Sequence, residues 1–337
     1  MKRLLILAPN WLGDAILALP AIADVRRELR GTEIVAVARP AIAPLFALVA
    51  DVDRTMTMDA AAPLRKAAKQ LAAEHGDAVL LLRNSMRAAL WTAAARIRER
   101  WGFAAYFRSP LLTRAVMAPS GLHQAEYYQR LVHALGFPNR SMAPRITVPA
   151  ALREAAAGAL REAGWNGDSP LVALAPGAAY GGAKRWPSKR FAGLARALAG
   201  DGVQPVLIGT AADRAAAADV ERGFAGEGRS LLSLVGRTDV PALAGVLAIC
   251  RALITNDSGA MHLAAAAGVP VVAIFGSTNE RATAPLAHAG VPGEIVTNPV
   301  WCRPCMLREC PIDHRCMTGI EPARVLAAVD RVAKVTA

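Results

Sequence analysis

The stretch APNWLGDAILALP, residues 8–20, places a glycine and a carboxylate directly after a short apolar run. Gly13 would let the backbone turn tightly, and Asp14 would fall in the first turn of the helix that follows. The positive end of a helix dipole favours an ionised carboxylate at that position. Asp14 is therefore a candidate general base that deprotonates a hydroxyl, and a simple helix cap is the structural alternative.

A second stretch, LAPGAAYGGAKRWPSKRF at residues 174–191, joins an apolar run to a helical pattern through small residues and cations. Gly177 and its neighbours allow a ligand to approach the backbone, and Lys184 follows where a phosphate would need a positive charge. The glycine spacing matches neither a P-loop nor a dinucleotide fingerprint. A phosphate-binding loop and a flexible solvent loop both remain open.

The third stretch, TNDSGAMHLAAAAGVPVVAIFG at residues 255–276, starts a helix directly after the apolar run ALI. Ser258 is a suitable helix N-cap, and Gly259 leaves the first amides of the helix open, which predicts a backbone site for a diphosphate. Asp257 would accept hydrogen bonds from sugar hydroxyls. His262 would either face the ligand or pack in the interior, and packing is the commoner role of a lone histidine.

Seven arginines and a single acid, Glu99, occur between Arg83 and Arg114, interleaved with aromatic residues. Such a segment could lie on anionic lipid or hold phosphates and carboxylates with its guanidinium groups. We expect Arg83, Asn84 and Arg87 to contact an acidic ligand. The alternative is that the aromatic side chains form part of a core and the arginines only flank them.

Four of the five cysteines lie in WCRPCMLRECPIDHRC, residues 301–316. Their thiolates could bind zinc, although the spacing differs from that of common zinc ribbons. Disulfides are unfavourable in a reducing cytoplasm, so we expect free thiols.

These polar stretches follow apolar runs that alternate with helical patterns, which predicts parallel sheets covered by helices on both faces. The alternation restarts after GWNGDS, residues 164–169. We therefore expect an α/β protein with two Rossmann-like, doubly wound domains, 1–164 and 165–320, facing a central cleft. A final helix in 321–337 would pack back on the first domain.

The charge of the chain indicates either an anionic partner or only a solvated, arginine-rich surface. The net charge is +12, and residues 1–150 hold 20 Lys and Arg against 11 Asp and Glu, a net +9. A nucleic-acid-binding protein is one alternative, but no reading helix, zinc finger or RNA-binding signature is present. A dinucleotide-dependent oxidoreductase is another, which the missing G-x-G-x-x-G disfavours. We do not expect the opening residues to act as a signal peptide, because Pro9, Asn10 and Asp14 interrupt their apolar run, and no apolar run is long enough to span a membrane.

Taken together and in this order, the three stretches resemble the heptosyltransferases of lipopolysaccharide core assembly, which are glycosyltransferases of the GT-B architecture. LLRNSMRAAL, residues 81–90, looks like a first-domain loop of the heptosyltransferase II branch. The resemblance implies metal-independent, inverting transfer of heptose from ADP-heptose to the heptose of a lipid A–Kdo–heptose acceptor. A sister transferase of the heptosyltransferase I or III type is the nearest alternative.

The resemblance also implies roles for individual residues. Asp14 would be the general base, Lys184 would neutralise the leaving diphosphate, and Asp213 would bind the ribose. Ser258, Gly259 and the amides beside them would hold the phosphates, with Asp257 on the heptose. No cofactor and no nucleic acid would be needed. The protein would work in the cytoplasm, peripherally on the inner face of the inner membrane.

Overall fold

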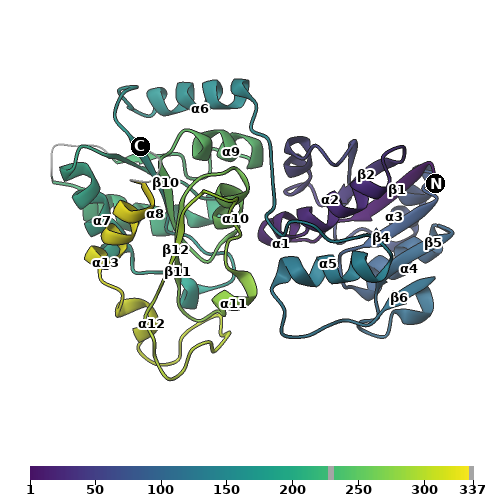
Figure 1. Cartoon of the computed structure of the whole chain (residues 1–337). Helices are drawn as coiled ribbons and strands as arrows, with labels where there is room; N and C mark the ends of the chain where they lie inside the picture. Colours follow the sequence, from purple (N-terminus) through teal and green to yellow (C-terminus); the bar gives the residue numbers. More distant parts are fainter. Residues whose placement is uncertain (227–230, 334–337) are drawn as a thin grey trace. The chain divides into compact units, whose positions relative to one another are not determined.

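The structure is a computed structural model that describes residues 1–226 and 231–333. The chain divides into two compact units, Met1–Thr147 and Val148–Ala337. Each unit is built on one six-stranded parallel sheet with helices on its faces, as the alternating pattern predicts (Figure 1). The α/β class and the two doubly wound sheets are therefore confirmed.

The first unit has strand order β3-β2-β1-β4-β5-β6, and every pair is parallel. Its strands are β1 (Arg3–Leu7), β2 (Glu33–Ala38), β3 (Arg54–Thr57), β4 (Ala78–Leu81), β5 (Glu99–Phe103) and β6 (Arg114–Val116). Its helices are α1 (Leu12–Leu17), α2 (Leu19–Glu28), η1 (Ala43–Leu48), α3 (Leu64–Ala73), α4 (Met86–Ala94), η2 (Ser109–Leu111) and α5 (Gln124–Ala134).

The second unit has strand order β12-β11-β10-β7-β8-β9, again with parallel pairs. Its strands are β7 (Leu171–Ala175), β8 (Gln204–Leu207), β9 (Leu232–Ser233), β10 (Ala252–Asn256), β11 (Val271–Phe275) and β12 (Gly293–Thr297). Its helices are α6 (Ala150–Glu162), η3 (Gly182–Lys184), α7 (Ser188–Gly200), η4 (Ala211–Asp213), α8 (Arg214–Phe224), α9 (Val240–Ala248), α10 (Gly259–Ala266), α11 (Glu280–Thr283), α12 (Arg315–Thr318) and α13 (Pro322–Ala333).

Strand order fixes where each sheet can bind a ligand. In the first unit the chain direction across the sheet reverses between β1 and β4, and in the second unit it reverses between β7 and β10. Ligands of open parallel sheets bind at the carboxyl ends of the strands at such a switch point. The loops that follow these four strands carry most of the candidate residues.

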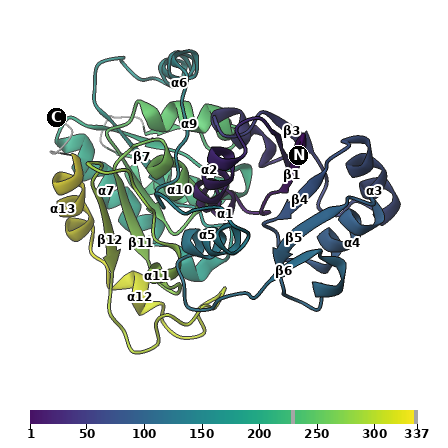
Figure 2. The ribbon, with the colours of Figure 1, turned by 45° about the vertical axis from the view of Figure 1, so that its right-hand side comes forward.

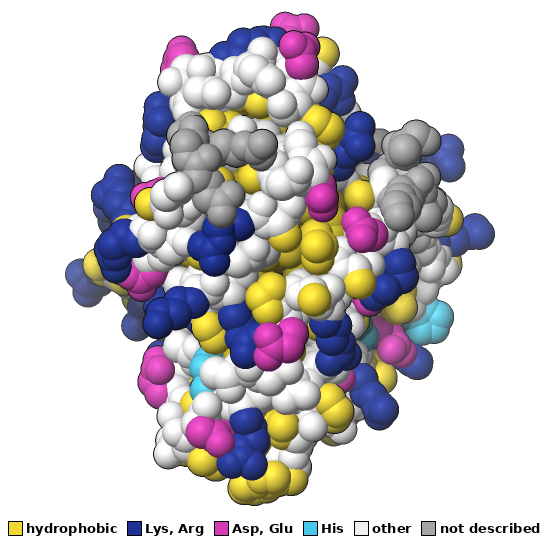
Figure 3. Space-filling model, turned by 90° about the vertical axis from the view of Figure 1, so that its left-hand side faces the viewer, with side chains coloured by type: hydrophobic (Ala, Val, Ile, Leu, Met, Phe, Trp, Pro, Cys, Tyr) yellow, Lys and Arg dark blue, Asp and Glu magenta, His cyan; other side chains and the backbone are white. Residues whose placement is uncertain are grey.

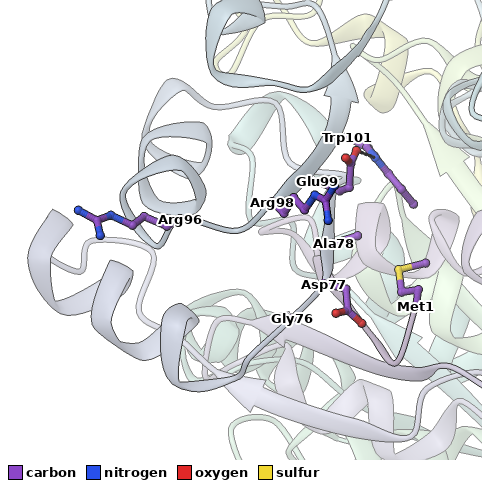
Figure 4. A pocket seen from close by; sticks show the side chains of 8 residues that line it. All are labelled: Met1, Gly76, Asp77, Ala78, Arg96, Arg98, Glu99 and Trp101. Atoms are coloured by element: carbon purple, nitrogen blue, oxygen red, sulfur yellow. Dashed lines mark hydrogen bonds between the residues drawn. The ribbon is translucent and has the colours of Figure 1, made fainter.

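A cavity of about 460 Å³ opens beside Asp77 and Glu99, at the opposite ends of the strands of the first sheet (Figure 4). Asp77 precedes β4 and Glu99 begins β5, so the cavity lies at the amino ends of these strands. Parallel sheets rarely place their chemistry there, and we do not assign the candidate site to this cavity.

Several local expectations differ from the structure. The single helix expected from residue 15 onward is divided into α1 and α2 at Ala18, because Pro20 has no amide hydrogen to continue the hydrogen bonding. Strands β5, β6 and β12 were not predicted.

The position of the division between the two units also differs from the expectation. Helix α6 contacts α9 and so lies in the second unit, which places the division at Thr147 and not near residues 164–169. Helix α13 packs on α7 and on strands β10 to β12 of the second unit (Figure 2).

Candidate active site

Asn256 organises the switch point of the second unit. This fully buried residue ends β10, and its Nδ2 donates to the carbonyl oxygens of Pro176 at 2.8 Å and Gly177 at 3.3 Å. Its Oδ1 accepts from the amide of Trp186 at 2.9 Å. One side chain thus holds both ends of the glycine-rich loop that follows β7. Asn256 was not among the predicted site residues, although a polar residue at the end of an apolar strand is a usable signal.

Lys184 and Asp257 form an ion pair across this switch point. Lys184 Nζ lies 2.6 Å from Asp257 Oδ2, and the side chains are only 15% and 7% exposed. Thr278 Oγ1 donates to the same carboxylate oxygen at 2.8 Å, and the Tyr180 ring centroid lies 5.0 Å from the ammonium nitrogen. An ammonium group has three hydrogens. The pair with Asp257 uses one of them and holds Lys184 in place, and the other N–H groups of Lys184 can still donate hydrogen bonds to an anion.

Ser258 occupies the N-cap position of α10, but its side chain makes no capping hydrogen bond. Ser258 Oγ instead lies 2.9 Å from Thr255 Oγ1. The expected capping role of the side chain is therefore wrong, while the first amides of α10, beginning with Gly259, keep the orientation that suits an anion. His262 lies one turn later and is buried, which agrees with the packed alternative.

Asp213 and Gly177, which are far apart in the sequence, lie against each other. A Cβ atom added to Gly177 would come within 2.0 Å of Asp213 Oδ1, so any larger residue at this position would displace the Asp213 carboxylate. Asp213 Oδ2 accepts hydrogen bonds from the amide and the hydroxyl of Thr210, both at 2.8 Å. The carboxylate thus caps its own turn. A role on a ribose stays a prediction.

Asp14 lies in the first turn of α1 at the switch point of the first unit. Gly13 is already the second residue of this helix, and the bend falls at Asn10 and Trp11, so the expected tight turn at Gly13 is wrong. Burial, followed by the negative charge of Asp14, raises the pKa of the Tyr128 hydroxyl. Asp14 is half-buried.

The three residues expected to contact an acidic ligand lie in different surroundings. Arg83 is buried, and its Nε donates to the carbonyl oxygen of Ala8 at 3.2 Å. Asn84 donates to the Tyr127 hydroxyl at 2.6 Å and accepts from Arg108 at 2.7 Å. Arg87 is exposed. Arg87 is therefore the one that presents its guanidinium group directly to the surface.

The basic and aromatic segment is only partly a surface. Trp91, Trp101 and Phe103 are buried in the first unit, in agreement with the core alternative. Tyr106 and Phe107 are 72% and 95% exposed, in the loop after β5. The core alternative therefore holds for the aromatic residues on α4 and at the end of β5, which are buried, and the surface alternative holds for Tyr106 and Phe107.

The cysteine-containing segment packs against the loop that carries Lys184. The amide of Ala183 donates to the carbonyl oxygen of Arg308 at 2.8 Å, and Gly182 N donates to Glu309 Oε1 at 2.8 Å. All five cysteines are free thiols. Burial, and then the nearby cysteines, raise the pKa of the Cys316 thiol. Within residues 1–226 and 231–333, no three or more His, Cys, Asp or Glu side chains gather as a metal site would require.

Comparisons with known proteins place this arrangement in a family. Residues 64–315 match the model of glycosyltransferase family 9 (heptosyltransferase). The chain is 28% identical over 306 residues to lipopolysaccharide heptosyltransferase 2 of Salmonella typhimurium, covering 85% of this chain and 86% of that protein. It is 29% identical over 309 residues to lipooligosaccharide heptosyltransferase 2 of Haemophilus ducreyi, covering 86% and 87%.

Solved structures of proteins from the same family are similar to this structure. The structure of ADP-heptose LPS heptosyltransferase II of Escherichia coli matches with a TM-score of 0.84 and 26% identity, covering 99% of each chain. A glycosyltransferase family 9 structure from Veillonella parvula matches with a TM-score of 0.85 at 22% identity, covering 99% of this chain and 97% of that one, and shows the same fold.

Proposed function

This chain belongs to glycosyltransferase family 9, the heptosyltransferases, and from that premise we propose that it transfers heptose from ADP-heptose to the first heptose of the lipopolysaccharide inner core. Its relatives named heptosyltransferase 2 and the Escherichia coli ADP-heptose enzyme support this substrate pair. The observation that carries the proposal is the Lys184–Asp257 pair beside the start of α10, at the switch point of the second sheet.

The second unit would bind the donor. Lys184 and the first amides of α10 supply positive charge where the diphosphate of ADP becomes more negative as the glycosidic bond breaks. Asp257 holds Lys184 at 2.6 Å and would also accept hydrogen bonds from the heptose. Asp213 lies beside Gly177 and would bind the ribose through the carboxylate oxygen that faces the glycine.

The first unit would bind the acceptor. Asp14 would remove the proton from the acceptor hydroxyl as its oxygen attacks the anomeric carbon from the face opposite ADP, which inverts the configuration. Positive charge from Arg87 would meet phosphates and Kdo carboxylates of the lipid A–Kdo–heptose acceptor. Arg83 is buried and Asn84 is half-buried, and both would shape this end of the site.

The acceptor carries a lipid, so we infer that the protein works peripherally on the inner face of the inner membrane. The excess positive charge of residues 1–147 and the exposed Tyr106 and Phe107 support attraction to anionic lipid. Among the helices of residues 1–226 and 231–333, none combines the length and apolar character that a bilayer crossing demands.

Mass analysis of the product would test the reaction. Purified protein is incubated with ADP-heptose and with truncated core acceptors that carry either no heptose or one heptose. We expect a gain of one heptose only on the acceptor that already carries one. Transfer only to the heptose-free acceptor would assign the chain to the first transfer step, and no transfer to either acceptor would refute the proposed function.

The general base is tested in the same assay. Asp14→Asn should lower kcat by about 10²–10⁴-fold, the usual contribution of a positioned base. Glu28→Gln, which neutralises an exposed carboxylate at the end of α2, is the matched control and should leave kcat unchanged. Equal rates for Asp14→Asn and the unmodified protein would remove Asp14 from the mechanism.

A further inference from the structure

Two buried polar atoms at the switch point of the first unit are left without hydrogen-bond partners. In the part of the chain that the structure describes, Arg83 Nη2 and Asn10 Oδ1 are both shielded from solvent and have no partner. Asn10 follows β1 and Arg83 follows β4, and these strands are neighbours with Leu7 opposite Leu81. Buried polar groups almost always have a hydrogen-bond partner. Each of these two atoms is therefore free to form a hydrogen bond with a ligand.

The geometry of Arg83 directs its unsatisfied hydrogens toward the loop that carries Asn10. Arg83 Nε donates to the carbonyl oxygen of Ala8 at 3.2 Å. The N–H groups of Nε and Nη2 point to the same side of the planar guanidinium fork. Nη2 therefore points to the side of the guanidinium group on which the carbonyl oxygen of Ala8 lies, and Asn10 follows Ala8 by two residues. Helix α1, which carries Asp14, begins two residues after Asn10.

The chemistry of the two atoms selects the ligand. Arg83 offers a donor and Asn10 offers an acceptor, so the matching group must accept one hydrogen bond and donate another. A sugar hydroxyl does both. A phosphate or carboxylate would satisfy Arg83 but would place its negative oxygen against the Asn10 carbonyl, and an ammonium group would be repelled by Arg83.

The surroundings of Arg83 hold the guanidinium group in place. Its Cζ lies 5.8 Å from the ring centroid of Trp91, and the main chain after β1 receives its Nε hydrogen bond. Burial and the nearby positive charge of Arg39 lower the pKa of Arg83 to about 10, so the group is still charged at neutral pH.

We propose that Asn10 and Arg83 form a hydroxyl-recognition subsite of the sugar acceptor, which binds a hydroxyl close to the one that Asp14 deprotonates. This inference rests on the proposed function and adds a specificity-determining pair to it. A site that hydrogen-bonds a hydroxyl discriminates strongly against an analogue that lacks it, because the buried polar groups are then left unpaired. The pair would therefore select the acceptor and orient it on Asp14.

The test combines protein variants with acceptors that each lack a single hydroxyl of the terminal sugar. Asn10→Ala should raise the KM for the complete acceptor about tenfold, the loss expected for one hydrogen bond, and leave the KM for ADP-heptose unchanged. One deoxy acceptor should be used equally well by Asn10→Ala and by the unmodified protein, because the bond is already missing. Asn139→Ala, an exposed asparagine of the same unit, is the control.

Arg83→Met should raise the KM for the complete acceptor in the same way, and should show no added loss with the same deoxy acceptor. This comparison requires that its thermal unfolding matches that of the unmodified protein. If the variant does not fold, Asn10→Ala alone decides. Calorimetric titration with the complete acceptor gives the affinity without turnover. An unchanged acceptor affinity in Asn10→Ala, or equal penalties for every deoxy acceptor, would overturn the subsite. Acceptor affinity that depends on Asn10 without any transfer of heptose would refute the proposed reaction and leave the subsite standing.

Discussion

At the scale of single residues, the Lys184–Asp257 pair combines a structural and a chemical role. Both side chains are mostly buried, and Thr278 adds a second hydrogen bond to the carboxylate. Removing one member of such a pair leaves an uncompensated charge, whereas removing both charges does not. Stability and catalysis can therefore be separated by substituting each residue singly and then both together.

We expect Lys184→Met and Asp257→Asn each to lower the free energy of unfolding by about 3 kcal/mol. The double variant should lose clearly less than the sum of the two, because no buried charge remains without a partner. Urea unfolding followed by circular dichroism measures this, with the exposed Lys189→Met as control. Heptose transfer should stay lost in the double variant. Recovery of activity together with stability would mean that the pair is only structural.

At the scale of elements, Asn256 joins the glycine-rich loop to β10. Asn256→Ala would leave buried carbonyl and amide groups of Pro176, Gly177 and Trp186 without partners. We expect a loss of about 3 kcal/mol in stability and, because Lys184 lies in the released loop, an approximately tenfold higher KM for ADP-heptose.

Asn166→Ala is the matched control for this change. Asn166 also makes three hydrogen bonds, to Ser169 Oγ and to the amides of Asp168 and Ser169, but it is exposed, so water can replace them. Steady-state kinetics and urea unfolding measure both variants. Equal effects of the two substitutions would contradict the role of Asn256 in holding the loop.

The same elements show what the sequence could predict. Strands such as β1 and β10 are buried on both faces and are therefore visible as apolar runs. Strand β5 was not predicted, because it begins with Glu99 and Arg100, which are only partly buried and interrupt the apolar pattern. Candidate residues were found because polar side chains follow strands. The partners of Lys184 and Asn256 were not found, because these contacts span 70 to 80 residues and depend on the strand order.

At the scale of the whole molecule, charge is distributed unequally between the units. Residues 1–147 carry 20 basic and 11 acidic side chains, whereas residues 148–337 carry 19 and 16. On the face of the protein shown in Figure 3, basic and acidic side chains are interleaved. The first unit also carries the exposed Tyr106 and Phe107. Attraction to anionic lipid through the first unit would thus have an electrostatic part and an apolar part.

Salt separates these two parts. Binding to anionic vesicles should weaken as the salt rises from about 50 to about 500 mM, because the Debye length shortens severalfold. Replacing Tyr106 and Phe107 by serine should lower the vesicle partition constant at least about tenfold at both salt concentrations, since apolar insertion is not screened. Trp301→Ser, which removes an 80% exposed aromatic residue from the second unit, is the control. An equal loss in this control would show that the first unit has no special affinity for lipid. Tighter binding to oligonucleotides than to vesicles would favour a nucleic-acid partner for the basic surface.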